Sequence, residues 1–289
     1  MITLPTISIV TPSYNQAAYL EASIGSVLGQ NYTATEYVVI DGGSSDGSVD
    51  IIRRYADRLH YWISEPDNGQ YDAINKGFSH TSGEIMAWLN SDDQYTPWAL
   101  RIVGEIFGSF PEIEWLTTLV PIIWDVRGLA VRSGSVQGFS RQGFWRGEHL
   151  PKAGWYATCM VQQESTFWRR SLWERAGGRI DTSVKLAGDF ALWANFYCYT
   201  DLYGVKTTLG GFRIHADQKT AHFLSEYTAE AAQVLSSYGA RPYSTLESFI
   251  RRRFLKYIPV RLALRLKLRY PCPAVVHVDR DNWWKVEWL

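Results

Sequence analysis

The sequence predicts an α/β protein whose central sheet is mostly parallel and flanked by helices. Short apolar runs alternate with stretches of helical periodicity over residues 1–105, and each run ends in a polar or glycine-rich cluster. Strands that alternate with helices at this spacing pair in parallel through right-handed crossovers. Ligands of such sheets bind outside the carboxyl ends of the strands. The polar clusters therefore predict a site built from successive strand ends.

The elements of this first third follow from periodicity and from turn residues. β-Branched and aromatic runs predict strands over 7–10, 37–40, 60–64 and 85–89. Apolar side chains at helical spacing predict helices over 20–28, from 48 to about 55, and over 71–80. Ser48 is the expected N-cap of the second helix. Pro97 stands where the first turn of a fourth helix would begin.

The second half of the chain is less regular. Short strands are expected within 115–124, helices over 167–176, 186–199 and 224–238, a strand over 207–214, and a long loop over 137–154. Trp168, Trp173 and Trp193 fall on these helices and are expected to pack in the core. No repeat or low-complexity linker interrupts the chain. We expect one fold with two halves (1–105 and 106–240) and a basic amphipathic extension (241–289).

Composition bounds the class of protein. Apolar residues make up 46% of the 289 and charged residues 20%, which is enough for a large core. The 29 basic and 29 acidic side chains balance, which argues against a nucleic-acid partner. Three cysteines without a CxxC pair predict neither a disulfide framework nor a zinc site. Without a readable signal peptide or a long apolar run, a cytoplasmic location is expected.

The charge is unevenly distributed. Residues 1–105 carry 13 acidic and 5 basic side chains, which suits divalent-metal or nucleotide chemistry. Residues 241–289 carry 4 acidic and 11 basic side chains, which suits an anionic partner. Over 241–270 the basic residues are interleaved with apolar ones. Two interpretations stay open: a segment at an anionic membrane surface, such as the cytoplasmic face, or a helical hairpin docked on the domain with a solvated basic face.

Four motifs occur in a characteristic order. They are Ile9-Val-Thr-Pro-Ser-Tyr-Asn15, Val39-Ile-Asp-Gly-Gly-Ser-Ser-Asp-Gly47, the segment 64–77, and Trp88-Leu-Asn-Ser-Asp-Asp93. Together they resemble the nucleotide-sugar-dependent glycosyltransferases of family 2. The resemblance implies the GT-A fold, a Rossmann-like, mostly parallel sheet flanked by helices, here with a C-terminal helical extension. It also implies inverting transfer from a nucleotide-sugar donor, with a UDP-sugar expected, to a saccharide or lipid-linked acceptor in cell-surface polysaccharide synthesis.

Asp92 and Asp93 are the expected metal ligands. Two adjacent carboxylates at a strand end repel each other without a cation, and Mn²⁺ or Mg²⁺ prefers oxygen ligands. Such an ion neutralises the diphosphate of the donor. Asn90 stands where the family often has Asp, so either carboxylate is open as the direct ligand, with the other on the ribose. The alternative is capping of the helix near Pro97.

The resemblance assigns further donor-side residues. Asp41 matches the carboxylate that accepts a hydrogen bond from the nucleobase, and Thr11 and Pro12 match the turn that lines the nucleoside pocket. Ordinary turn chemistry is the alternative for all three. His215 lies in a late motif whose His approaches the metal or the diphosphate; the alternative is a structural histidine.

On the acceptor side, Asp189 matches the family's general base, which deprotonates the acceptor hydroxyl. Glu164 is the reserve candidate for that role. The alternative for Asp189 is a carboxylate that stabilises a helix N-terminus through the macrodipole.

Two alternative functions fit the sequence less well. A nucleotidyltransferase is expected to carry a glycine-rich, basic loop after the first strand, and residues 11–15 have neither feature. A non-catalytic, nucleotide-binding, membrane-associated subunit is disfavoured by the presence of Asp41, Asp92, Asp93 and Asp189.

Overall fold

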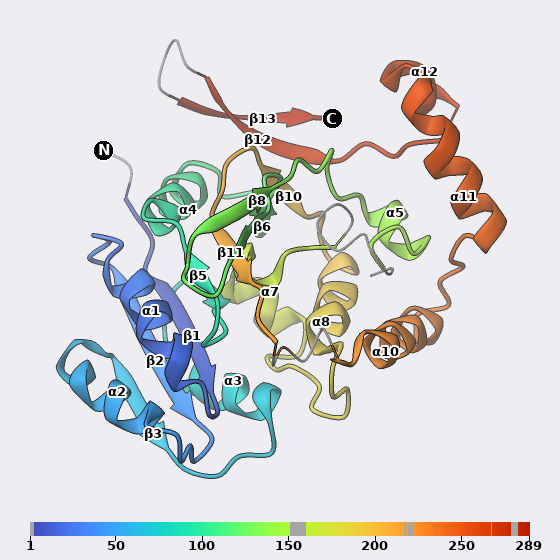
Figure 1. Cartoon of the computed structure of the whole chain (residues 1–289). Coiled ribbons are helices and arrows are strands. Elements are labelled where there is room, and N and C mark those ends of the chain that lie inside the picture. Colours follow the sequence, from blue (N-terminus) through green and yellow to red (C-terminus); the bar gives the residue numbers. More distant parts are fainter. Residues whose placement is uncertain (1–2, 151–159, 217, 219–221, 267, 279–282) are drawn as a thin grey trace.

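The computed structural model describes residues 3–150, 160–216, 218, 222–266, 268–278 and 283–289. A nine-stranded sheet crosses the molecule in the order β13-β12-β10-β6-β9-β4-β1-β2-β3, flanked by helices (Figure 1). Its amino-terminal strands lie at one end and the carboxyl-terminal hairpin at the other (Figure 1). A smaller sheet has the order β5-β11-β7-β8. No described helix is long and apolar enough to cross a membrane.

The elements expected in the first third are confirmed. They are β1 (Ile7–Ser13), α1 (Ala17–Leu28), β2 (Thr35–Asp41), α2 (Ser48–Arg54), β3 (Tyr61–Ser64), α3 (Gln70–Ser79), β4 (Ile85–Trp88) and α4 (Ala99–Ser109). The structure adds the short 3-10 helix η1 (Ala56–Arg58) and the two-residue strand β5 (Gln94–Tyr95). Strands β4, β1, β2 and β3 pair in parallel, as the alternating pattern predicts. Strands β1 and β4 are buried throughout, which explains their continuous apolar runs.

One helix start differs from the expectation. Gly47, at φ 97°, is the N-cap of α2, and Ser48 is its first helical residue. The Asp46 carboxylate accepts hydrogen bonds from both the backbone N–H and the hydroxyl of Ser48. Asp46 therefore supplies the side-chain oxygen that a cap at Ser48 would have supplied.

The second half contains several elements that the sequence did not predict. Its elements are β6 (Trp115–Thr118), β7 (Ile122–Trp124), β8 (Ala130–Ser133), α5 (Arg141–Trp145), the 3-10 helix η2 (Gln163–Ser165), β9 (Phe167–Arg169), α7 (Arg170–Arg175), α8 (Gly188–Tyr197), β10 (Tyr203–Val205), β11 (Gly210–Arg213) and α10 (Leu224–Ser237). The helix α5 lies inside the expected loop 137–154, of which 151–154 fall outside the described residues. The hydroxyl of Ser140 caps it by accepting from the Gly143 N–H at 3.0 Å.

The predicted helix over 167–176 was wrong in its first turn. Residues 167–169 form β9, which pairs antiparallel with both β4 and β6, and a helix follows only from Arg170. Trp168 packs against Trp88, with ring centroids 5.5 Å apart, and against Trp193 at 5.9 Å. These partners are distant in the sequence, so local periodicity does not reveal them. The three predicted packing tryptophans, Trp168, Trp173 and Trp193, are all buried.

The carboxyl-terminal extension is partly helical, as expected, but it also contains strands. It comprises α11 (Thr245–Phe254), the 3-10 helix η3 (Leu255–Tyr257), α12 (Val260–Arg265), β12 (Pro273–Val278) and β13 (Trp283–Trp288). Strand β12 pairs in parallel with β10, and β13 pairs antiparallel with β12. The extension therefore completes the main sheet.

Candidate functional site

A cavity of about 780 Å³ opens where β1, β2 and β4 end. Part of its lining comes from the ends of these strands and the residues after them, including Pro12, Gly42 and Asp92. Another part comes from η2, the start of α8 and α10, and includes Glu164, Asp189 and Tyr227. The polar strand ends thus meet at one site, as the sequence pattern predicts.

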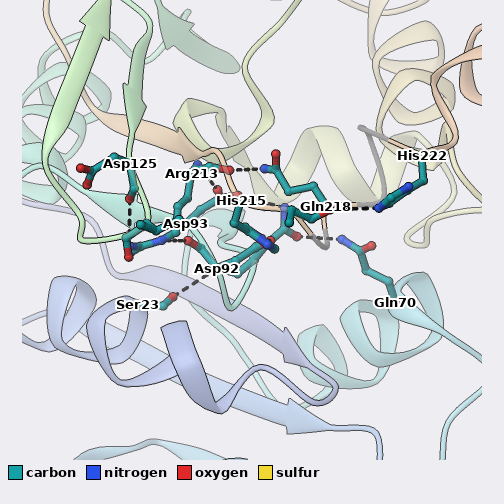
Figure 2. A network of polar contacts seen from close by, with 12 residues as sticks. Ser23, Gln70, Asp92, Asp93, Asp125, Arg213, His215, Gln218 and His222 are labelled. Atoms are coloured by element: carbon teal, nitrogen blue, oxygen red, sulfur yellow. Dashed lines mark hydrogen bonds and ion pairs between the residues drawn. The ribbon is translucent and has the colours of Figure 1, made fainter.

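Asp92 and His215 come together across a sequence separation of 123 residues. The Nε2 atom of His215 lies 3.0 Å from Oδ2 of Asp92 (Figure 2). His215 follows β11 of the small sheet, whereas Asp92 follows β4 of the large one. The ring of His215 is buried, and its centroid lies 4.5 Å from that of Tyr19 on α1. Asp92 lines the cavity, and 23% of its side chain is exposed.

The neighbouring Asp93 is committed to the protein interior. Its Oδ1 accepts from the backbone N–H of Arg213 at 2.9 Å, and its Oδ2 accepts from Nδ2 of Asn90 at 3.1 Å (Figure 2). Burial raises the pKa of Asp93 well above its ordinary value, and the charges of Asp92 and Glu164 raise it further. Of the two adjacent carboxylates, Asp92 is the more exposed, although both are among the lining residues. A role of Asp93 as a second metal ligand stays a prediction.

Arg213 holds this acidic turn in place. Its Nε donates to the backbone carbonyl of Asp92 at 2.5 Å, and its Nη1 donates to the carbonyl of Val126 at 3.1 Å. The guanidinium lies 5.2 Å from the ring centroid of Tyr19, within cation–π range. Burial lowers the pKa of Arg213, and the negative charges of Asp93 and Asp92 oppose this shift. This buried cation offsets part of the negative charge that gathers around Asp92.

The expected nucleoside-side residues separate into two groups. Pro12 lines the cavity, as do the glycines Gly42 and Gly43. Thr11 and Asp41 are fully buried and are not among the lining residues. The hydroxyl of Thr11 lies 3.0 Å from that of Tyr37. The contact of Thr11 and Asp41 with a nucleoside stays a prediction.

Asp41 shapes the loop that carries the lining glycines. Its Oδ2 accepts from the N–H groups of Gly43 and Ser44 at 3.1 and 2.9 Å and from the hydroxyl of Ser64 at 2.7 Å. Its Oδ1 accepts from the hydroxyl of Ser44 at 2.6 Å. Four hydrogen bonds fill most of the accepting capacity of a carboxylate. In this arrangement Asp41 stabilises the cavity wall.

Asp189 lies in the first turn of α8 and faces the cavity. Its Oδ1 accepts from the hydroxyl of Tyr227 at 2.9 Å and from the N–H of Phe190 at 2.8 Å. Burial raises the pKa of Asp189 to about 6, and these hydrogen bonds oppose the rise. The group is therefore ionised at neutral pH but takes up a proton just below it, as a general base requires.

Glu164 lies in η2 on the same wall and differs in its protonation. Burial raises its pKa to about 8, and the charges of Asp92 and Asp189 contribute. Its Oε1 is buried and has no hydrogen-bond partner among the described residues. At neutral pH Glu164 is mostly protonated, so it is a poorer base than Asp189.

Two tyrosines support the acceptor wall and were not singled out from the sequence. Tyr227, on α10, bonds Asp189 across 38 residues. The hydroxyl of Tyr71, on α3, donates to the Leu186 carbonyl at 2.6 Å and accepts from the Gly188 N–H at 2.9 Å. Since neither tyrosine lies near Asp189 in the chain, no local pattern could have linked them to it.

The lining is markedly acidic. Its acidic members are Asp67, Asp92, Asp93, Glu164 and Asp189, and Lys185 is the one Lys or Arg among the described lining residues. Within the described part of the chain, no three His, Cys, Asp or Glu side chains are grouped as a ready metal site. Asp92 and His215 nevertheless fit a divalent ion that also binds substrate phosphates, because such ions need only one or two protein carboxylates. The Nδ1 atom of His215 is buried without a described partner.

Known proteins identify the family. The model of the family described as glycosyl transferase family 2 matches residues 8–115. An uncharacterized glycosyltransferase of Mycobacterium tuberculosis (strain CDC 1551 / Oshkosh), MT1564, is 40% identical over 203 residues, which cover 68% of this chain and 72% of the relative. The chain belongs to glycosyl transferase family 2. The putative teichuronic acid biosynthesis glycosyltransferase TuaG of Bacillus subtilis (strain 168) is 36% identical to this glycosyltransferase over 94 residues, 32% of this chain and 37% of TuaG.

Solved structures confirm the GT-A fold of this family 2 glycosyltransferase. Residues 1–349 of S. aureus TarS in complex with UDP-GlcNAc superpose with a TM-score of 0.58 at 15% identity, covering 91% of this chain and 76% of that one. The mannosyltransferase PcManGT of Pyrobaculum calidifontis, in complex with GDP-Man and Mn²⁺, has a TM-score of 0.56 at 15% identity, covering 92% and 84%. The chain spans 46% of the longer TarS chain.

Proposed function

We propose that this glycosyltransferase transfers a sugar from a nucleotide-sugar donor, with a divalent metal ion, to a saccharide or lipid-linked hydroxyl with inversion. One observation carries the proposal: Asp92 and Asp189, which are 97 residues apart in the sequence, line a single cavity. The first suits the metal and diphosphate, and the second suits activation of an acceptor. A single base and direct displacement suffice for inversion, and the second carboxyl group, Glu164, is mostly protonated at neutral pH.

The acidity of the cavity supports the need for a metal ion. A nucleotide diphosphate is an anion, and the lining offers it five carboxyl groups and one described lysine. Asp92 and His215 would hold Mn²⁺ or Mg²⁺, which when bound neutralises the leaving diphosphate. The bound Mn²⁺ of PcManGT is a precedent on the same fold. Arg213 keeps Asp92 oriented through its main-chain carbonyl.

On the nucleoside side, we propose that Thr11, Pro12 and Asp41 form the base and ribose pocket. Pro12 contacts the nucleoside directly, whereas Asp41 acts mainly by holding the loop of Gly42 and Gly43 against it. A UDP-sugar is our expected donor, and the UDP-GlcNAc complex of TarS is consistent with it. The GDP-Man complex of PcManGT makes a GDP-sugar the first alternative to test.

On the acceptor side, Asp189 removes the proton of the attacking hydroxyl as the new glycosidic bond forms. The hydroxyl of Tyr227 orients the carboxylate, leaving Oδ2 toward the acceptor as the base. The lining near it includes Phe212 and Phe223, whose flat apolar surfaces suit the C–H faces of a sugar ring. The name of TuaG supports an acceptor in cell-surface polysaccharide synthesis.

The test measures donor turnover and sugar transfer over UDP-, GDP- and dTDP-sugars with Mn²⁺, Mg²⁺ or EDTA. We expect EDTA to abolish both activities and either ion to restore them. Asp92→Asn should lower metal-dependent turnover by about 10²-fold or more. The matched control is Asp57→Asn, which removes an exposed carboxylate of η1 and should leave turnover unchanged. Full activity after rigorous chelation would contradict the proposal.

A further inference from the structure

The helical segment 245–266, formed by α11, η3 and α12, presents apolar side chains to the outside. It lies at the periphery of the molecule, on the side of α5 and α10 (Figure 1). Leu246 is 67% exposed and Phe249, one turn later, is 63% exposed. The exposed large hydrophobic residues of this segment are Leu246, Phe249, Phe254, Tyr257, Leu262 and Leu266. We refer to this set of residues as the apolar face.

The opposite side of α11 is held by a buried charge. Arg251 is only 15% exposed; its guanidinium lies 4.2 Å from the ring centroid of Tyr243, and its Nη2 lies 3.1 Å from Oε1 of Glu148. Arg251 also donates to the carbonyl of Leu268. A surface helix normally buries its apolar side and exposes its charges. In α11, Leu246 and Phe249 are exposed whereas Arg251 is turned toward the protein, an arrangement that suits an apolar medium outside.

The charge of the segment indicates which medium. Residues 241–269 contain nine Lys and Arg residues and one acidic residue, Glu247. Glu247 is used in the capping box at the start of α11, where it accepts from the Ser244 N–H at 2.8 Å. Arg253 and Arg265 are exposed beside the apolar residues. Apolar side chains in a segment with a large excess of positive charge match the interface of an anionic lipid bilayer.

We propose that the apolar face inserts into the headgroup region of an anionic membrane, with the surrounding arginines on lipid phosphates. When the segment is bound to a membrane, Arg251 and Tyr243 keep their contacts with the rest of the protein. The two interpretations of the tail, a docked hairpin and a membrane segment, then describe different sides of one segment. The inward side is docked on the domain, and the outward side contacts lipid. This inference does not depend on catalysis, because binding to vesicles is measured without donor or acceptor.

The test is co-sedimentation of the full chain with vesicles of phosphatidylcholine alone or with about one-third phosphatidylglycerol. We expect binding to the anionic vesicles only. Raising the salt from about 0.1 M to about 1 M should release the protein, because the Debye length falls from about 10 Å to about 3 Å. Equal binding to both vesicles, or binding that ignores salt, would overturn the proposal.

Two variants separate the apolar and the charge contributions. Leu246→Ser with Phe249→Ser should weaken binding about tenfold or more. Its matched control is Leu129→Ser with Val131→Ser, which removes two exposed apolar side chains around β8 and should bind like the parent.

The charge variant is Arg253→Gln with Arg265→Gln, and it should weaken binding about 30-fold, or about fivefold for each arginine near the surface. Because all four substituted side chains of the two test variants are exposed, circular dichroism should show unchanged folding. Light scattering without lipid tests the alternative of self-association. A dimer of the parent that dissociates in the Leu246→Ser, Phe249→Ser variant would assign the apolar face to a second copy and overturn the lipid assignment.

Discussion

Replacing Asp189 with asparagine should damage catalysis while stabilising the fold. The variant keeps the size of the side chain, and its amide oxygen can still accept from the hydroxyl of Tyr227, now at 2.9 Å, and from the Phe190 N–H. It cannot take a proton from an acceptor. We expect sugar transfer to fall by about 10²–10⁴-fold, the usual range for loss of a general base. Donor binding should be nearly unchanged.

The size of the expected change in the free energy of unfolding follows from the pKa of Asp189. Burial raises it from 3.8 to about 6, so the folded state binds this proton more tightly than the unfolded chain does. The stability contributed by protonated Asp189 is therefore fully present below pH 3.8 and is lost as the pH rises through about 6. At about 1.4 kcal/mol per pH unit, the loss reaches about 3 kcal/mol. At pH 8 the Asp189→Asn variant should be more stable than the parent by up to that amount.

Urea unfolding at pH 4 and pH 8 measures the stability difference, and initial rates between pH 5 and 8 measure transfer. The parent rate should have an acid limb with an apparent pKa near 6, so that at pH 5 it is about one-tenth of its plateau. The control is Glu164→Gln, which should change transfer far less because Glu164 is already mostly protonated. Loss of transfer in Glu164→Gln but not in Asp189→Asn would reverse the assignment. A variant no more stable than the parent at pH 8 would refute the burial argument.

Two further substitutions probe the walls of the cavity. Asp41→Ala should weaken donor binding by about 1–3 kcal/mol in calorimetry and also lower the thermal transition, because three hydrogen bonds from the cavity loop and one from Ser64 are lost; unchanged donor affinity would remove Asp41 from the donor site. Gly188→Ala would bring a Cβ within 2.6 Å of the Tyr71 ring, so we expect about 1–3 kcal/mol of destabilisation in urea unfolding and reduced transfer. Gly25→Ala, which meets nothing within 4 Å on α1, should instead raise stability by about 1 kcal/mol; equal effects of the two substitutions would contradict the packing argument.

Sequence patterns were sufficient for the first third of the chain. Each strand there is a short apolar run, each crossover is an amphipathic helix, and both properties depend on residues within one or two turns. The parallel pairing of these strands then follows from the helical crossovers between them, whereas their order β4-β1-β2-β3 came from the structure. The location of Asp92 at a strand end, and therefore at the cavity, was predictable for the same reason.

The secondary structure of the second half was harder to predict because its elements are stabilised by contacts with residues that are distant in the sequence. Residues 167–169 look helical locally but are held as a strand by pairing with β4 and β6. The hairpin β12–β13 gains its place from pairing with β10, about 70 residues earlier in the chain. Strand stability of this kind comes from cross-strand contacts, which a local pattern does not contain.

The chemistry of the site divides in the same way. Residue types and their order were enough to choose the carboxylates and to expect a metal and a base. Only the folded structure distinguishes Asp92 from Asp93. Arg213 and Asn90 each donate a hydrogen bond to an oxygen of Asp93, whereas the side chain of Asp92 is more exposed to the cavity. Likewise, burial separates Asp189, with a pKa of about 6, from Glu164, with a pKa of about 8. Desolvation and hydrogen bonding depend on every neighbour in space, so these differences exist only once the chain is folded.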